Sequence, residues 1–153
     1  PVKATVVQLA TYLQNYLTRA NLVDNGTVEF WFTGDLDTPV LHVDVDRDTG
    51  PVVKHIIENR QNYFGKVVPV VSGEYTPREV ADAFSKVTGV AMRLENRAPE
   101  ELVNDDMRNM YKFFAYPEWL GNPDEIRQFN DRIGHEFSTP DTFWQTNGWK
   151  GPE

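Results

Sequence analysis

The sequence predicts an α/β fold, in which helices pack on a sheet that is at least partly parallel. Apolar runs of strand length recur along the chain, and several of them lead into amphipathic, capped helices. The hydrophobic content of 40% and the charged content of 25% are values typical of a globular protein. At 153 residues the chain is long enough for one domain with a core of its own.

The chain opens with an apolar segment at residues 5–9. Its β-branched side chains are typical of a strand buried on both faces in a parallel sheet. Residues 11–22 follow, and their apolar positions repeat at helical spacing: Tyr12, Leu13, Tyr16 and Leu17. We therefore expect a strand that leads into a helix. Because this strand pattern starts almost at residue 1 without a start methionine, we interpret the opening as a cut edge.

Two further strands are expected within residues 27–46. Asn25 and Gly26 form a turn signal, and residues 27–32 then alternate with large apolar side chains on one face. Residues 33–39 are expected to form a loop. Residues 39–46 alternate again, which predicts a half-buried strand with an apolar face of Leu41, Val43 and Val45 opposite His42 and Asp44.

A helix is expected to begin at Asp48, which is a good capping residue and is followed closely by Pro51. Its apolar stripe consists of Val52, Val53, Ile56 and Ile57. The acidic spacing of Asp44, Asp46 and Asp48 also raises the alternative of a cation loop. That loop would need a later bidentate glutamate and a turn glycine, so a strand end followed by a helix cap is the favoured interpretation.

The second half of the chain contains the clearest helix signal, at residues 76–89. Thr76 is the cap, Pro77 the first helical residue, Glu79 completes a capping box and Gly89 follows the end. A strand at 66–73, with Pro69 indicating an edge or bulge, precedes this helix. The remaining elements expected are a strand at 90–94, one or two helices within 98–119, a helix capped by Asn122 and a short turn from Thr139.

Composition excludes several classes of function. A net charge of −8 and a pI near 4.9 argue against direct nucleic-acid binding, because no basic surplus is present to neutralise phosphates. The chain has no cysteine, which excludes disulfides and thiolate chemistry and fits a cytosolic or nuclear address. No apolar run approaches the roughly 20 residues of a membrane helix, so we expect a soluble chain without membrane contact.

Familiar catalytic and cofactor motifs are absent from the sequence. No glycine-rich dinucleotide loop and no phosphate-binding P-loop occurs, so any such site is expected upstream of Pro1. The three histidines show no metal-ligand spacing, and we expect no metal site. No catalytic residue is assigned.

The polar and aromatic cluster of Tyr12, Gln14, Asn15 and Tyr16 is the best candidate for a binding site. It follows a parallel strand, and ligands in open α/β sheets sit beyond the carboxyl ends of strands. The alternative is that these aromatic residues simply pack in the core. His42 also has two interpretations, since it either faces a pocket or is solvated or hydrogen-bonded on its strand. The tryptophans and the Phe113–Phe114 pair are interpreted first as core or subunit contacts.

Three stretches of the sequence resemble the NmrA-like family of atypical short-chain dehydrogenases. They are TVVQLATYLQNYL, VLHVDVDRDTGPVVKHIIEN and GKVVPVVSGEYTPREVADAFSKVTG, and the closing TFWQTNGW is also similar. The resemblance implies a Rossmann-like, NAD(P)-binding fold. It covers the back half of that fold, so residues 1–153 would be the C-terminal half, with the last Rossmann strands and the smaller substrate-binding subdomain.

The resemblance also carries functional expectations. It implies the substrate-side portion of an NAD(P)H-dependent oxidoreductase or redox sensor, with Leu9, Tyr12 and Asn15 bordering the cleft. NADP or NAD would bind the full-length protein, and this chain alone would neither bind it tightly nor catalyse a reaction. The partners implied are the missing N-terminal half and a small-molecule substrate. Two alternatives stay open: a non-catalytic module of the nitrogen-repression regulator type that binds a protein partner, and a self-standing ligand-binding domain of another fold.

Overall fold

The computed structural model describes residues 3–23, 26–102, 104–114 and 119–152. The strands are β1 (Val6–Leu9), β2 (Thr11–Tyr12), β3 (Ala20–Val23), β4 (Thr27–Phe32), β5 (Val40–Val43), β6 (Val67–Val70), β7 (Gly73–Tyr75) and β8 (Met92–Asn96). The α-helices are α1 (Asn15–Thr18), α2 (Val45–Glu58), α3 (Pro77–Thr88), α4 (Asp105–Phe114), α5 (Pro123–Ile133) and α6 (Pro140–Asn147). Two short 3-10 helices are η2 (Arg60–Asn62) and η3 (Pro99–Glu101).

The described strands form three small sheets. β1 pairs in parallel with β6, and β5 lies between β2, which is parallel to it, and β7, which is antiparallel. In the third sheet β4 lies between antiparallel β3 and parallel β8. Since only Ala10 separates β1 from β2, the chain passes directly from the first sheet into the second.

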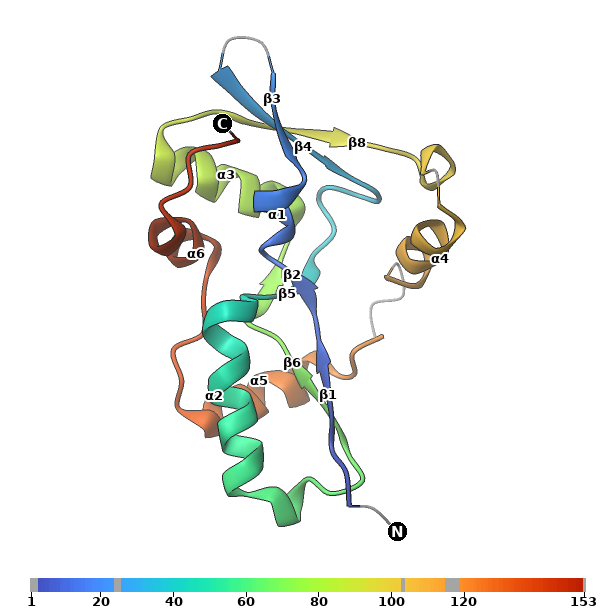
Figure 1. Ribbon diagram of the computed structural model, residues 1–153, viewed down its shortest axis with the longest axis vertical. Helices are drawn as coiled ribbons and strands as arrows, with labels where there is room; N and C mark the ends of the chain where they lie inside the picture. Colours follow the sequence, from blue (N-terminus) through green and yellow to red (C-terminus); the bar gives the residue numbers. More distant parts are fainter. Residues whose placement is uncertain (1–2, 24–25, 103, 115–118, 153) are drawn as a thin grey trace.

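Two groups of helices pack against these sheets (Figure 1), and each group contributes to one of two cores. α2 and α5 pack near β1 and β6, whereas α3 and α6 lie together beside β3, β4 and β8. The first core consists of Ala10, Leu41, Val43, Val52, Ile56, Val68, Val70, Val71, Leu120, Ile126 and Phe129. The second core consists of Leu13, Tyr16, Ala20, Val28, Phe30, Val80, Ala83, Phe84, Phe143 and Trp144. The second core is built largely from aromatic rings, with Trp144 in edge contact with Phe84 and Tyr16.

One edge of β1 has no strand beside it in the part of the chain that the structure describes. Its residues pair only with β6, in a register that matches Val6 with Val67. Val7 and Leu9 pack on the first core, but Val6 and Val67 are 56% and 58% exposed. The expectation of a strand covered on both faces is therefore wrong for these residues, because no described segment covers the face that carries Val6.

The predicted helix over residues 11–22 is wrong. Residues 15–18 form a single helical turn, α1, and the chain then returns to an extended strand, β3. β3 pairs with β4 from Ala20 opposite Phe30 to Val23 opposite Thr27. Pairing across this hairpin overrides the helical spacing, a common outcome when a tertiary partner is available. The predicted turn residue Asn25 lies outside the described residues.

The boundary between β5 and α2 also differs from the prediction. α2 begins after Asp44, whose side chain accepts a hydrogen bond from the Arg47 backbone N–H at 3.3 Å. Asp48 is therefore not the cap but a fully buried residue within the helix, and Pro51 lies in the helix interior. β5 is buried on both faces rather than one, since Leu41, His42 and Val43 are all buried.

Other predicted elements are confirmed. Thr76 and Glu79 form the capping box of α3, and Gly89 follows its end in the left-handed conformation with φ of 74°. Asn122 caps α5 as predicted. Thr139 was expected to start a short turn, but it caps α6, a helix of 8 residues. β4 alternates as expected, with Val28 and Phe30 buried. Of the segment expected to be helical within 98–119, the structure describes η3 and α4, while Val103 and residues 115–118 lie outside the described residues. Within the described ranges, every helix is too short or too polar to cross a membrane.

Candidate functional site

A cavity of about 610 Å³ lies where the two cores meet. This volume is within the range of sites that bind small molecules. Its wall combines residues at the end of β1 and in β2 and α1, the end of β4 with the loop that follows, the beginning of β5, and α4. Most of these side chains are apolar, among them Leu9, Phe30, Phe32, Leu41 and Phe114.

The structure brings four of the five predicted site residues together at this cavity. Leu9, Tyr12, Asn15 and Tyr16 all line it, so the segment that follows β1 does border a hollow large enough for a ligand. Tyr12 is 42% exposed and lies toward solvent, whereas Tyr16 is 1% exposed and belongs to the second core. Both interpretations of the aromatic cluster therefore hold for Tyr16, which packs in a core and lines the cavity.

His42 does not line the cavity and is not solvated. Its side chain is fully buried, and its Nδ1 donates a hydrogen bond to the backbone oxygen of Val40 at 2.8 Å. Burial lowers the pKa of His42 to about 4, although the hydrogen bond to Val40 acts in the opposite direction. His42 is therefore neutral near pH 7, and its Nε2 has no hydrogen-bond partner among the described residues.

The hydroxyl group of Tyr16 is buried without a hydrogen-bond partner in the described part of the chain. Its ring stacks on Phe30 with centroids 4.3 Å apart and lies 6.0 Å from the ring of His42. Burial raises the pKa of the Tyr16 hydroxyl well above its ordinary value, and the nearby Tyr111 acts in the same direction. Tyr16 therefore keeps its proton at neutral pH.

Two more hydroxyl groups in the cavity wall are buried without a described hydrogen-bond partner. Thr11 and Thr33 line the cavity, and their Oγ1 atoms are buried without a partner among the described residues. An unpaired buried hydroxyl costs roughly 1–3 kcal/mol, and native proteins usually pair such groups with protein, water or ligand. The hydroxyl oxygens of Thr11, Tyr16 and Thr33 are therefore buried within the wall, whereas the other polar members of the lining include Asn15, Arg19, Asp35, Thr38 and Glu74.

Sequence reasoning missed the side of the cavity that α4 provides. Met110, Tyr111 and Phe114 line it from this helix, and Trp119 lines it from the following segment. The Arg19 guanidinium donates a hydrogen bond to the Tyr111 hydroxyl at 2.9 Å, which connects α1 to α4. Arg19 and Tyr111 are 92 positions apart, so no local pattern connects them. The sequence shows only the apolar helical spacing of α4, which indicates burial but does not identify the partner.

The cavity wall contains charged groups of both signs. Arg19 is engaged with Tyr111 and lies over the Trp31 ring, 5.6 Å from its centroid. Asp35 and Glu74 are the two acidic members of the wall. The Asp37 backbone N–H holds the pKa of Asp35 below its ordinary range, so this carboxylate is ionised at neutral pH.

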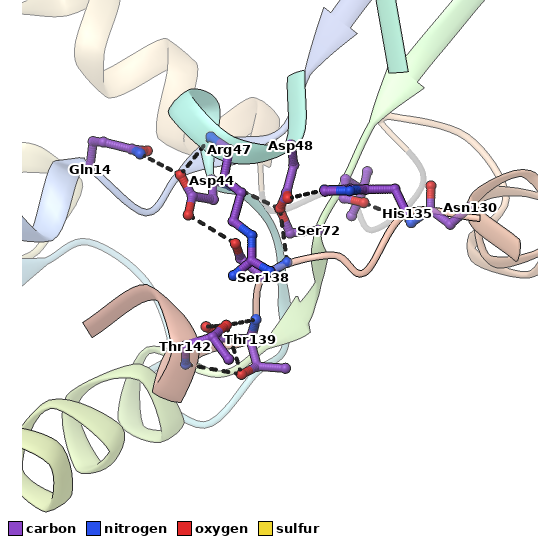
Figure 2. A network of polar contacts seen from close by, with 11 residues as sticks. Gln14, Asp44, Arg47, Asp48, Ser72, Asn130, His135, Ser138, Thr139 and Thr142 are labelled. Atoms are coloured by element: carbon purple, nitrogen blue, oxygen red, sulfur yellow. Dashed lines mark hydrogen bonds and ion pairs between the residues drawn. The ribbon is translucent and has the colours of Figure 1, made fainter. Parts of the chain in front are cut away.

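A second polar cluster lies away from this cavity and joins four distant segments (Figure 2). Asp48 accepts hydrogen bonds from the Ser72 hydroxyl, from the Ser138 backbone N–H at 3.0 Å and from His135 Nε2 at 2.8 Å. The Ser138 hydroxyl in turn donates to Asp44 at 2.9 Å, and Gln14 donates to the other Asp44 oxygen at 2.8 Å. We call Asp44, Asp48, Ser72, His135 and Ser138 the aspartate network.

The aspartate network is built for stability rather than for nucleophilic catalysis. It contains serine, histidine and aspartate, but the Ser72 hydroxyl donates to Asp48 and not to His135. A serine nucleophile needs a base that accepts its proton, and the base must be held by a third group. Asp48 and Ser138 are also fully buried. Within the described ranges, no group of three or more His, Cys, Asp or Glu side chains is arranged to hold a metal ion.

The described residues do not fit the diphosphate of a dinucleotide. Such a group binds backbone N–H groups at the N-terminus of a helix that follows a strand. At α2 this position is occupied by the Asp44 carboxylate, and at α3 by the Thr76 hydroxyl and the Glu79 carboxylate. Acidic groups at both helix starts would repel a diphosphate.

The parallel pairing, the covering helices and a cavity at the end of a strand define an α/β protein of the Rossmann-like class. Comparison with known proteins agrees with this class. The chain is similar to NmrA, described as a negative transcriptional regulator, in its complexes with NAD (TM-score 0.73) and with NADP (TM-score 0.72), at 15% identity in both. It is also similar to a nucleoside-diphosphate-sugar epimerase from Staphylococcus aureus, with a TM-score of 0.64 and 20% identity.

The model of the NmrA-like family matches residues 2–140, and the chain belongs to this family. A curated relative, the NmrA-like family domain-containing oxidoreductase cpsB of Aspergillus campestris, is 30% identical over 83 residues, which are 50% of this chain and 24% of that protein. The NmrA structures are matched over 97% of this chain and 56% of theirs, and the epimerase over 94% and 52%. The chain thus spans about a quarter of the curated relative and just over half of each solved structure. The predictions of the family and of a Rossmann-like α/β fold are confirmed.

Proposed function

We propose that this chain is the substrate-side portion of an NAD(P)-binding NmrA-like protein, and that residues 1–153 form the C-terminal half of the domain. The open edge of β1 supports this proposal, because β1 and β6 form a parallel pair of only two strands, which is smaller than the usual sheet, and another strand could pair at this edge. In this arrangement another segment of the polypeptide pairs with β1 and supplies the dinucleotide site. The acidic starts of α2 and α3 are consistent with a diphosphate site elsewhere.

The cavity beside the end of β1 is the observation on which the proposed activity depends. A ligand there lies next to Leu9 and Tyr12, where the carboxyl end of a parallel strand usually meets the cofactor. We propose that the complete protein is an NAD(P)H-dependent oxidoreductase that reduces a small molecule bound in this cavity. A volume of about 610 Å³ is sufficient for a small-molecule substrate.

The alternative is a redox sensor that binds NAD(P) without turnover and regulates a protein partner. It is favoured by the structural likeness to NmrA, which is described as a negative transcriptional regulator. In either case the chain has no cysteine, and we propose a cytosolic or nuclear location.

The test is a titration of NADPH into the full polypeptide that carries this chain, followed by tryptophan fluorescence, with the 153 residues alone as the comparison. We expect binding by the full polypeptide and none by the chain alone. Oxidation of NADPH is then followed with a panel of quinones and carbonyl compounds. Turnover supports the reductase, whereas binding without turnover supports the sensor. Tight binding of NADPH to the 153 residues, or no binding by the full polypeptide, contradicts the proposal.

A further inference from the structure

α4 differs from the other described α-helices in how little of it is buried. It spans Asp105–Phe114 and contains no buried residue, whereas α3, which is of similar length, contains five. Within the described ranges, neither core includes a residue of α4. Segments with few buried contacts open at a lower free energy than the packed elements of the same protein. α4 therefore has the burial pattern of an element that moves.

The apolar side of α4 borders the cavity. Met110, Tyr111 and Phe114 line the hollow from this helix, and each of them is partly exposed. These side chains therefore lie against open space, whereas those of α3 lie against a packed core. Leu102 before the helix and Leu120 after it are buried, so the segment is anchored at both ends. Displacing α4 widens the cavity and leaves both cores packed.

One hydrogen bond fastens α4 to the opposite side of the cavity. The Arg19 guanidinium donates to the Tyr111 hydroxyl at 2.9 Å, and the Tyr111 ring is in edge contact with Phe32, with centroids 6.2 Å apart. Among the described residues, the other hydrogen bonds and ion pairs of α4 stay within residues 104–114, as in the pair of Arg108 and Asp105. The position of the helix over the cavity thus depends on the contact at Tyr111.

Arg19 is itself held on the sheet. Its guanidinium lies over the Trp31 ring, 5.6 Å from the centroid, and Trp31 belongs to β4. Arg97 lies over the same ring at 5.3 Å, so Trp31 contacts two guanidinium groups. A guanidinium held against an aromatic ring is pre-organised and loses little freedom when it forms a further bond. Arg19 is therefore the half of the contact that the sheet carries, and Tyr111 is the half that α4 carries.

From these observations we infer that α4 is a lid over the cavity and that the hydrogen bond between Arg19 and Tyr111 keeps it closed. Opening separates Tyr111 from Arg19 and moves Met110 and Phe114 away from the hollow. A small molecule enters through this gap and is then covered by the same side chains, which exclude water from it. The lid goes beyond the proposed function, because it requires the cavity but no dinucleotide.

Access to the cavity is measured with a thiol placed in its wall. The chain has no cysteine, so a single introduced cysteine reports on one position. Leu41→Cys places a thiol in the cavity wall, and Val80→Cys places one in the second core outside the cavity; both original side chains are buried. Each variant of the full polypeptide is treated with N-ethylmaleimide. The rate of modification at each position is then measured by peptide mass spectrometry.

Tyr111→Phe is the variant that weakens the lid. It keeps the ring and removes the hydroxyl to which Arg19 donates. We expect it to raise the rate at Leu41→Cys about fivefold, the usual net effect of one hydrogen bond, and to leave the rate at Val80→Cys unchanged. Arg19→Met should give a similar increase. Adding Tyr111→Phe to Arg19→Met should give no further increase, because the same bond is already lost.

Tyr63→Phe is the matched control, since it also removes a tyrosine hydroxyl that has one partner. That hydroxyl bonds to His55, and Tyr63 lies outside this cavity. The variant should leave both rates unchanged. Thermal unfolding is measured for every variant. If Leu41→Cys does not fold, Val40→Cys, another member of the cavity wall, takes its place.

Two results would overturn the lid. Equal rates at Leu41→Cys with and without Tyr111→Phe would show that α4 does not control access to the cavity. A rise at Val80→Cys as large as that at Leu41→Cys would mean that the change loosens the whole chain. Neither result depends on NADPH. A failed lid therefore leaves the proposed function standing, and a confirmed lid stands even when NADPH does not bind.

Discussion

Asp48 shows how one buried side chain holds distant parts of the chain together. Its carboxylate accepts hydrogen bonds from Ser72, His135 and Ser138, and it is fully buried. A buried carboxylate is tolerated only when such partners replace its water. The three partners are in turn left without an acceptor when Asp48 is removed.

We therefore expect Asp48→Ala to lower the free energy of unfolding by about 3 kcal/mol or more. Asp46→Ala is the matched control, because Asp46 lies in the same helical turn but is exposed. Its effect should stay below about 1 kcal/mol. Urea unfolding of both variants in the full polypeptide measures the difference. Equal losses for the two variants would show that the aspartate network contributes little.

His42 predicts how stability depends on pH. Burial lowers its pKa to about 4 in the folded chain, whereas an exposed histidine has a pKa near 6.5. The unfolded chain therefore binds a proton that the folded chain does not between these two values. The contribution of His42 to the free energy of unfolding is therefore fully present above pH 6.5. It is lost as the pH falls toward 4, and the loss is roughly 3 kcal/mol in total.

The variant His42→Gln removes the titrating imidazole. We expect the wild type to lose about 3 kcal/mol more than the variant between pH 7 and pH 4, measured by urea unfolding at each pH. The comparison subtracts the carboxylates, which titrate in both proteins. Parallel pH profiles would mean that His42 is protonated in the folded chain.

At the scale of elements, the helix with a complete local signal was predicted best. The capping box of α3 depends on residues three positions apart, and Gly89 directly follows its end, so this signal is complete within the sequence. The start of α2 was misplaced because Asp44 and Asp48 are both suitable caps. In the structure Asp44 caps the helix and Asp48 is buried, and both carboxylates bond to Ser138, which is about 90 residues away in the sequence. The helix predicted over residues 11–22 was wrong for a similar reason. The strand β3 forms because it pairs with β4, and this pairing is not visible in the local pattern.

The same distinction applies to the candidate site. The rule that ligands meet the carboxyl ends of strands pointed to Tyr12, Gln14, Asn15 and Tyr16, and the family resemblance added Leu9. Four of these residues line the cavity, whereas Gln14 bonds to Asp44 instead. No local signal could point to Tyr111, because its contact with Arg19 spans 92 residues. His42 was ambiguous in the sequence, because strand alternation does not show whether a polar face meets solvent or a second layer.

The contribution of the α3 capping box to the free energy of unfolding is measurable at Thr76. Its hydroxyl accepts from the Glu79 N–H at 3.0 Å, and the Glu79 carboxylate accepts from the Thr76 N–H at 2.7 Å. Thr76→Ala should lower the free energy of unfolding by about 1 kcal/mol, and Thr76→Ser should restore most of it. Chemical denaturation of both variants checks the prediction. A loss in Thr76→Ser as large as that in Thr76→Ala would assign the effect to the methyl group.

At the scale of the whole molecule, the open edge of β1 predicts a pattern of amide exchange. The N–H groups of Val6 and Ala10 donate to β6 and its flank, at 2.9 and 3.1 Å. Successive N–H groups of a strand point to opposite sides, so those of Val7 and Leu9 point to the unpaired edge. In the full polypeptide we expect Val7 and Leu9 to exchange as slowly as Val6 and Ala10.

Hydrogen exchange followed residue by residue by NMR makes this comparison within one strand. Slow exchange at all four positions indicates a strand on each side of β1. Fast exchange confined to Val7 and Leu9 would mean that β1 is a true edge, and the proposed two-part domain would then be wrong.

The aspartate network also sets an order of events during synthesis. Asp44 emerges from the ribosome long before Ser138, its partner 94 residues later, and His135 lies 87 residues after Asp48. Until that late segment is available, Asp44 has donors only in Gln14 and the Arg47 N–H, and Asp48 has Ser72, so the burial of both carboxylates is incomplete. Contacts of such long sequence separation form slowly. We therefore expect the aspartate network to be completed only after translation has passed residue 138.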